Sequence, residues 1–186
     1  MRRHFAARST LPDEHCLWDW LDEARDRIGI ASSNRGLTPR DFAATMVLAI
    51  SNASETITAH VGDGAAVGRI GQEQQWIALS GPENGEYAST TYFATDNPAA
   101  RMRFSHSYET LDSLCLFTDG IEHQVMDAIS GEPYARFFDP LRRPFAASAE
   151  PGRNAHLSGR LAAYLDGPQL AEHTDDDKTL IVAVAG

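Results

Sequence analysis

The sequence predicts an α+β fold in which antiparallel strands are combined with helices. Residues 44–79 contain four segments with strand-like patterns, 44–51, 56–62, 66–70 and 75–79. The connections between them are at most four residues long, which is too short for the crossover that parallel neighbours need. A helical pattern precedes these segments and others follow them, so helices and antiparallel strands share the chain.

The first element is an amphipathic helix over residues 12–29. Apolar residues recur there at helical spacing after Thr10 and Pro12, namely Leu17, Trp18, Leu21, Ala24 and Ile28. We expect this stripe to cover a sheet. Residues 38–41 resemble a capping box, but the strand-like run that follows limits any helix there to one turn.

The second half of the chain alternates loops, strands and helices. Residues 80–105 are polar, with Tyr92 and Phe93 as candidate anchors, and predict a long surface excursion. A strand over 113–118 stops at Asp119. The later elements expected are a helix over 121–129, a broken helix or packed loop around Pro140 and Pro144, a short helix over 158–165 and a final strand over 178–185.

Length, charge and cysteine usage limit the classes of protein. The 186 residues support a single domain over 1–186, and 16 basic against 26 acidic residues give a net charge of −10. Nucleic acid is therefore an unfavourable partner, whereas cations are plausible ones. No apolar run approaches the roughly 20 residues of a membrane span, and Cys16 and Cys115 match no disulfide or metal-ligand spacing. We expect a soluble, cytoplasmic protein.

The stretch HVGDGAAVGRIG, residues 60–71, could be a phosphate-binding loop or a tight turn. A dinucleotide fingerprint needs a helix after the glycines, but the following residues alternate like a strand. We interpret the stretch as part of a meander in which Gly62 and Gly64 flank Asp63, because glycine adopts positive φ at little cost.

Three aspartates, Asp63, Asp119 and Asp176, each lie at the tip of an apolar strand. Since antiparallel strands place the end of one beside the start of the next, all three could gather at one edge of the sheets. Taken singly, each is typical of a turn. Gathered carboxylates need a hard cation to neutralise them, and oxygen ligands favour Mg²⁺ or Mn²⁺.

Several motifs carry a family resemblance. The stretches HVGDGAAV (60–67), LCLFTDGIEH (114–123) and DDKTLIVAV (176–184) occur in the order and spacing of motifs of the metal-dependent protein phosphatase 2C family. GEYASTTYF (85–93) and RDFAATMVLAI (40–50) resemble its bacterial branch.

This resemblance implies a four-layer αββα sandwich of two antiparallel sheets, and an edge site where two divalent ions bridge a water that attacks a phosphoserine or phosphothreonine. By position, Asp119 and Asp176 match ligands of a core metal, and Asp63 matches a ligand of a third metal. Asp177 and His123 are further candidate ligands, although the family commonly has an aspartate at the position of His123.

The chain also departs from the family pattern. An early acidic motif with a phosphate-binding arginine is absent, and so is an Asp-Gly turn whose aspartate bridges both metals. We therefore expect an N-terminally incomplete domain that lacks the first strands, with no confident catalytic residue. Arg2 and Arg3 are candidate substitutes for the lost phosphate contact.

Three functions remain open at this point. The first is a Mg²⁺- or Mn²⁺-dependent protein serine/threonine phosphatase, inactive as written if the bridging Asp-Gly motif is required. The second is a non-catalytic pseudophosphatase that serves as a binding or regulatory module, and the third is an unrelated acidic β-rich binding domain. The expected partners are a phosphoprotein substrate, a Ser/Thr kinase and, through exposed sheet edges, a second copy of the chain.

Overall fold

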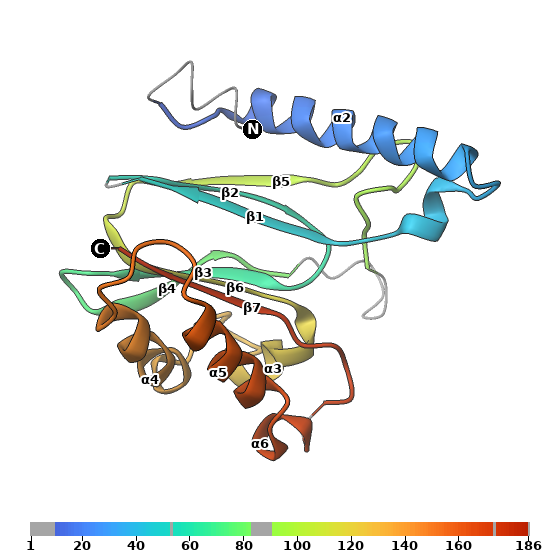
Figure 1. The fold of residues 1–186 in the computed structure, drawn as a ribbon. Helices are drawn as coiled ribbons and strands as arrows, with labels where there is room; N and C mark the ends of the chain where they lie inside the picture. Colours follow the sequence, from blue (N-terminus) through green and yellow to red (C-terminus); the bar gives the residue numbers. More distant parts are fainter. Residues whose placement is uncertain (1–9, 53, 83–90, 173, 186) are drawn as a thin grey trace. The chain divides into compact units, whose positions relative to one another are not determined.

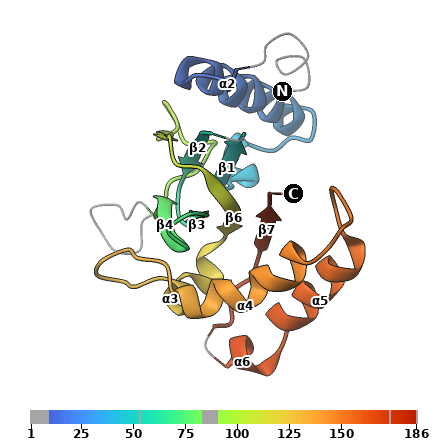
Figure 2. The ribbon, with the colours of Figure 1, turned by 90° about the vertical axis from the view of Figure 1, so that its left-hand side faces the viewer.

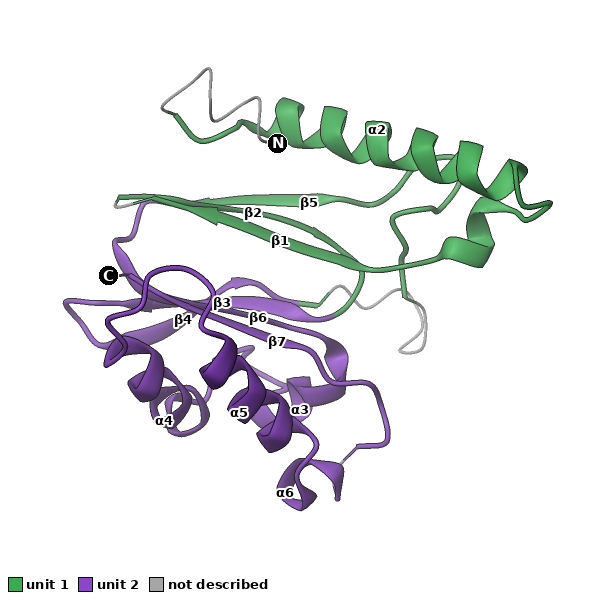
Figure 3. Ribbon diagram, viewed as in Figure 1, with its two compact units in different colours: residues 1–63, 82–107 green, residues 64–81, 108–186 purple. Residues whose placement is uncertain are grey.

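The computed structural model describes residues 10–52, 54–82, 91–172 and 174–185. Arg2, Arg3 and the beginning of the predicted excursion, residues 83–90, lie outside these ranges. The chain divides into two compact units, which Figure 3 distinguishes by colour: unit 1 comprises residues 1–63 and 82–107, and unit 2 comprises residues 64–81 and 108–186. Each unit contains one antiparallel sheet.

Unit 1 is a three-stranded sheet covered by one long helix. The strands are β1 (Met46–Ser51), β2 (Thr56–Val61) and β5 (Arg103–Ser107), in the order β1-β2-β5, and α2 (Glu14–Ser33) lies along the sheet (Figure 1). The one-turn η1 (Pro39–Phe42) connects α2 to β1 and carries the predicted capping box at Thr38. The core between helix and strands is formed by Leu17, Leu21, Ile57, Ala59, Val61, Ala100 and Met102.

Helix α2 confirms the predicted amphipathic element with shifted ends. It begins after Asp13, whose side chain accepts a hydrogen bond from the Cys16 amide at 2.9 Å, and such a cap satisfies a donor that the first turn leaves open. Burying Leu17 and Leu21 stabilises the helix by about 1.5–3 kcal/mol each. Ala24, predicted to lie on the buried stripe, is exposed.

Unit 2 is a four-stranded sheet in the order β4-β3-β6-β7, with helices packed on it (Figures 1 and 2). Its strands are β3 (Ala65–Ile70), β4 (Gln75–Ser80), β6 (Leu111–Phe117) and β7 (Leu180–Val184). Its helices are η2 (Asp119–Ile121), α3 (Glu122–Val125), α4 (Ala135–Ala146), α5 (Ala155–Leu165) and α6 (Pro168–Ala171). None of the helices in the described ranges is long and apolar enough to cross a membrane.

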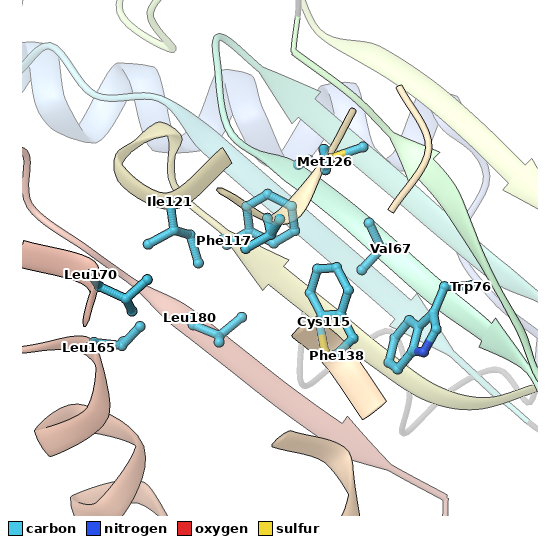
Figure 4. Close-up of a cluster of buried hydrophobic side chains, with 12 residues drawn as sticks. Val67, Trp76, Cys115, Phe117, Ile121, Met126, Phe138, Leu165, Leu170 and Leu180 are labelled. Atoms are coloured by element: carbon cyan, nitrogen blue, oxygen red, sulfur yellow. The ribbon is translucent and has the colours of Figure 1, made fainter. Parts of the chain in front are cut away.

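The core of unit 2 is aromatic at its centre. Phe138 of α4 is fully buried, and its ring centroid lies 4.9 Å from that of Trp76 and 5.9 Å from that of Phe117 (Figure 4). Helices and sheet are joined by this cluster, whose buried members are Ala65, Val67, Trp76, Cys115, Phe117, Ile121, Val125, Met126, Phe138, Leu165, Leu170 and Leu180.

The structure corrects the predicted meander. Strands β1 and β2 pair with each other, and β3 pairs with β4, but β2 and β3 belong to different sheets. The expected tight turn at Gly62 and Gly64 is present, with φ of 91° and 86°. Short connections predict pairing only between strands that are neighbours in the sequence. Here β2 also pairs with the distant β5, and β3 with the distant β6, which the local pattern does not reveal.

The predicted excursion over 80–105 is wrong at its C-terminal end. Strand β5 begins at Arg103 and pairs along β2 from Thr56↔Ser107 to His60↔Arg103. Its sequence marks it only weakly, because a short, partly exposed edge strand alternates few apolar residues with polar ones.

Helix α4 corrects the prediction of a broken helix, because it continues through Pro140 and Pro144. Each proline removes a backbone donor, but tertiary contacts compensate. Asp139 accepts a hydrogen bond from Trp76 Nε1 at 2.9 Å, and Arg142 donates from Nε to Ser113 Oγ at 2.6 Å. The helix is therefore fixed to strands β4 and β6 by residues that follow Phe138.

The helix predicted over 121–129 ends early, since α3 stops at Val125. The Asp127 carboxylate accepts hydrogen bonds from the Ile129 and Ser130 amides at 2.9 and 2.8 Å. This local turn offers the backbone an alternative to further helix.

Candidate functional site

Asp119 and Asp176 lie on two chain segments that contact each other at the end of the unit 2 sheet. Phe117, the last residue of β6, pairs with Leu180, the first residue of β7. Because the pairing is antiparallel, the residues after β6 continue beside those before β7. This register brings together the two chain segments that carry Asp119 and Asp176, which are far apart in sequence.

Hydrogen bonds extend the contact beyond the strands. The Thr118 amide donates to Thr179 O at 3.2 Å, and Thr118 Oγ1 accepts from the Thr179 amide at 3.0 Å. The same hydroxyl donates to Asp177 O at 3.3 Å. The backbone on both sides of the two carboxylates is therefore held in one arrangement.

Gly120 lets the two segments approach closely. A Cβ at this buried position would lie 2.4 Å from Asp177 O and 3.4 Å from Asp176 Cβ. Only a residue without a side chain fits there, so the glycine following Asp119 is required by packing rather than by a special backbone angle.

The side chains of Asp119, Asp176 and Asp177 are exposed to solvent. Magnesium is commonly held by one or two carboxylates while water completes its coordination, and two acidic segments at an exposed edge suit this mode. In the described ranges, no group of three or more His, Cys, Asp and Glu side chains gathers closely enough to enclose a metal ion. The residues thus fit an open, hydrated site rather than a closed protein cage.

Asp63 belongs to unit 1 and follows β2 in the chain. Its carboxylate is half-buried, and Oδ2 accepts a hydrogen bond from Thr91 Oγ1 at 2.7 Å. His60 Nε2 lies 2.9 Å from the Asp63 carbonyl oxygen. That Asp63 is a ligand of a third metal stays a prediction.

His123 lies on α3 with its side chain exposed. Asp177 contacts Thr118 through its backbone carbonyl. These contacts do not bear on metal binding, so the roles of His123 and Asp177 as ligands remain predictions.

Sequence reasoning did not single out Thr91, His60 or Arg103, which surround Asp63. His60 pairs with Arg103 across β2 and β5, a register that depends on finding β5. The alternating segment MRFSHS, residues 102–107, is the signal that could have revealed this strand.

Cysteine chemistry is excluded at Cys115. Burial within β6 raises the pKa of its thiol to about 12, and a nucleophilic cysteine must instead be present as a thiolate. Cys115 therefore acts as a small apolar side chain in the core of unit 2.

Known proteins match both the sequence and the fold. The sequence pattern of the family described as "Protein phosphatase 2C" matches residues 1–166. Serine/threonine-protein phosphatase 3 of Escherichia coli (strain K12) is 34% identical over 161 residues, which are 86% of this chain and 62% of that protein. The chain thus spans less than two thirds of the length of this relative.

Solved bacterial structures share the fold at low identity. PppA, a key regulatory component of T6SS in Pseudomonas aeruginosa, matches with a TM-score of 0.61 and 17% identity, covering 95% of this chain and 71% of that one. The serine/threonine phosphatase Stp1 from Staphylococcus aureus matches with a TM-score of 0.57 and 16% identity, covering 99% and 73%. The expected α+β architecture of two antiparallel sheets with helices is confirmed.

These matches exclude the alternative of an unrelated acidic β-rich binding domain. The family pattern covers far more than half of the residues, and the relative in E. coli is similar over most of the chain. The chain therefore belongs to the protein phosphatase 2C family.

Proposed function

We propose that this chain is the catalytic domain, or a large part of it, of a serine/threonine protein phosphatase that requires Mn²⁺ or Mg²⁺. The family is metal dependent. The observation that carries the proposal is the contact between the Asp119 and Asp176 segments, where Gly120 leaves no room for a side chain.

Charge supports a metal at this edge. With a net charge of −10, the protein repels a phosphate dianion on average. A divalent ion held by Asp119 and Asp176 reverses that sign locally, and Asp63 is proposed as the ligand of a further ion. When bound, such an ion lowers the pKa of a coordinated water and stabilises charge on phosphoryl oxygens.

The chain's own residues supply position and charge. Asp119 and Asp176 present carboxylate oxygens to solvent, and the bonds from Thr118 to Thr179 and Asp177 fix the spacing of the two segments. In the proposed hydrolysis a water oxygen bonds to phosphorus as the bond to the serine or threonine oxygen breaks. The attacking water gives up one proton and the leaving oxygen takes up one, so the products are the free alcohol and inorganic phosphate.

The test is hydrolysis of p-nitrophenyl phosphate and of a phosphothreonine peptide with Mn²⁺, Mg²⁺ or EDTA. Asp119→Asn and Asp176→Asn should each reduce metal-dependent turnover by at least about 100-fold, since each removes a charged ligand. Asp175→Asn is the matched control, because it removes the same charge from an exposed neighbour in the same acidic run; its turnover should stay within about twofold of wild type.

Equal losses of turnover in all three variants would show a general effect of charge and contradict the proposed roles of Asp119 and Asp176 as metal ligands. Mn²⁺ binding without hydrolysis by the wild-type chain would favour the non-catalytic binding module instead.

Partners and location are part of the same proposal. We infer that the substrate is a phosphoprotein and that a Ser/Thr kinase is a candidate partner. We also infer that the protein acts in the cytoplasm, which is supported by two cysteines that form no disulfide. The family match over 1–166 includes residues of both units and supports a single phosphatase domain.

In the described ranges β7 pairs with β6 alone, and this open edge supports homodimerisation. Light scattering that showed only monomer at high concentration would contradict the dimer.

A further inference from the structure

We infer that His60 and Thr91 are positioning residues for the Asp63 carboxylate, which they hold ready to bind a divalent cation. The inference rests on the proposed function. Its structural basis is a set of contacts in unit 1 that converge on Asp63, here called the Asp63 brace and formed by His60, Thr91 and Arg103.

His60 is fully buried, and both of its ring nitrogens make hydrogen bonds. Arg103 Nη2 lies 3.0 Å from Nδ1, and a guanidinium can only donate. Nδ1 must therefore accept, so the proton is on Nε2, which donates to the Asp63 carbonyl oxygen at 2.9 Å. The neutral ring thus connects β5 to the backbone of Asp63.

Arg103 also holds the turn itself. The same Nη2 donates to Gly62 O at 3.3 Å. Gly62 has φ of 91°, and a Cβ there would lie 2.6 Å from both Thr45 Cγ2 and Tyr92 O. The turn is pressed against the segment that follows Thr91, so it has little freedom to move.

Thr91 acts on the carboxylate directly. Its Oγ1 donates to Asp63 Oδ2 at 2.7 Å, and among the described residues nothing donates to Oδ1. The segment after Thr91 is anchored in turn by Arg25, which donates to Ala94 O at 2.6 Å and to Asp96 O at 2.9 Å. Within the described residues, one carboxylate oxygen is thereby fixed by a donor, and we infer that the other takes the ligand.

This arrangement differs from that of turn-forming aspartates in the same chain. Asp13, Asp41 and Asp127 each accept a hydrogen bond from a backbone amide two or three residues away. In the described part of the chain Asp63 accepts none from an amide, and its partner Thr91 lies 28 residues away. A carboxylate that does not build its own turn but is oriented by a distant hydroxyl resembles a metal ligand with an outer-shell partner.

The first test measures Mn²⁺ affinity from the EPR signal of the free ion, at fixed pH and without substrate. Thr91→Val should weaken binding about 10-fold, the low end of the effect of losing an outer-shell partner, and Thr91→Ser should restore it because the hydroxyl returns. Melting temperature in EDTA shows that each variant is folded.

A double-mutant cycle identifies the route of the effect. In an Asp63→Asn background, Thr91→Val should cause no further loss, because its effect passes through the carboxylate. An unchanged loss in that background would overturn the inference.

A pair of His60 variants separates the two bonds of the ring. His60→Gln retains a donor near Nε2, whereas His60→Asn retains only an acceptor near Nδ1. His60→Gln should bind Mn²⁺ within about threefold of wild type, and His60→Asn about 10-fold more weakly, even where both melt at similar temperatures. If the Mn²⁺ affinities of the two variants changed only in proportion to their melting temperatures, His60 would have a purely structural role and the inference would be overturned.

Different results would contradict the proposed function and the inference about His60 and Thr91. A wild-type chain that binds no Mn²⁺ would overturn the proposed metal dependence, and this inference with it. If the wild-type chain binds Mn²⁺ and the Thr91→Val variant binds it with the same affinity, only the inference is overturned.

Discussion

Replacing Gly120 by alanine tests the contact on which the proposed site depends. The new Cβ would lie 2.4 Å from Asp177 O, about 1 Å short of the 3.4 Å at which ordinary contact begins. Asp177 O is a backbone atom, so it cannot rotate away as the end of a flexible side chain could. We therefore expect the segments that carry Asp119 and Asp176 to separate by up to about 1 Å.

The expected cost follows from packing. Overfilling a tight site costs about 1–3 kcal/mol, and the reduced entropy of the unfolded chain returns about 0.4–1 kcal/mol. A net loss of about 1–2 kcal/mol corresponds to roughly 2–8 °C in melting temperature for a chain of this length. Ligand distances in a metal site tolerate only about 0.2 Å, so Mn²⁺ affinity should fall at least about 10-fold.

The assay combines thermal unfolding in EDTA with an Mn²⁺ titration. Gly159→Ala is the matched control, because Gly159 lies inside α5 with nothing within 4 Å of an added Cβ. It should stabilise the protein by about 0.5–1 kcal/mol and leave Mn²⁺ binding unchanged. If Gly120→Ala also kept wild-type stability and Mn²⁺ affinity, the close approach of the two segments would be refuted.

Three further predictions concern the core, the thiols and pH. Phe138→Ala should destabilise the protein by about 3–5 kcal/mol in urea unfolding, because it empties the centre of the unit 2 core; a loss below about 1 kcal/mol would contradict this packing. A thiol reagent at pH 8 should label Cys16 in the native protein and Cys115 only after unfolding, since burial raises the Cys115 pKa to about 12; equal labelling rates would contradict it. Hydrogen bonds from the amides of Ser130 and Ile129, that of Ser130 being the larger effect, lower the pKa of Asp127 in the folded protein. The ionised Asp127 carboxylate therefore stabilises the fold above the unfolded pKa of about 4, and this stabilisation is lost as the pH falls through the lower folded pKa. Asp127→Asn should make the fall of melting temperature below pH 4 shallower, and an identical pH profile would argue against the shift.

Much of the fold could be predicted from local patterns. Alternation placed most strands within two residues of their observed ends, as with β2 (Thr56–Val61) and β4 (Gln75–Ser80). The glycines around Asp63 were expected at positive φ and are found there. Such features depend on neighbouring residues, so one sequence is sufficient to reveal them.

Other features depended on contacts between distant residues. Helix α4 continues through two prolines because Phe138 is buried and Arg142 bonds to β6, and local propensity is outweighed by that packing. Strand β5 was missed because its polar residues form a strand only beside β2.

The candidate site shows the same division. The positions of the aspartates before or after apolar strands can be predicted from the amino-acid pattern, because strand periodicity and turn chemistry are local. That Asp119 and Asp176 lie at the same edge is evident only in the folded chain, because the register of β6 on β7 is set by burying alternate side chains of both strands in one core. The same holds for the contacts of Thr91 with Asp63 and of Arg103 with His60, because hydrogen bonds between residues 28 positions apart and between two strands exist only once the chain is folded.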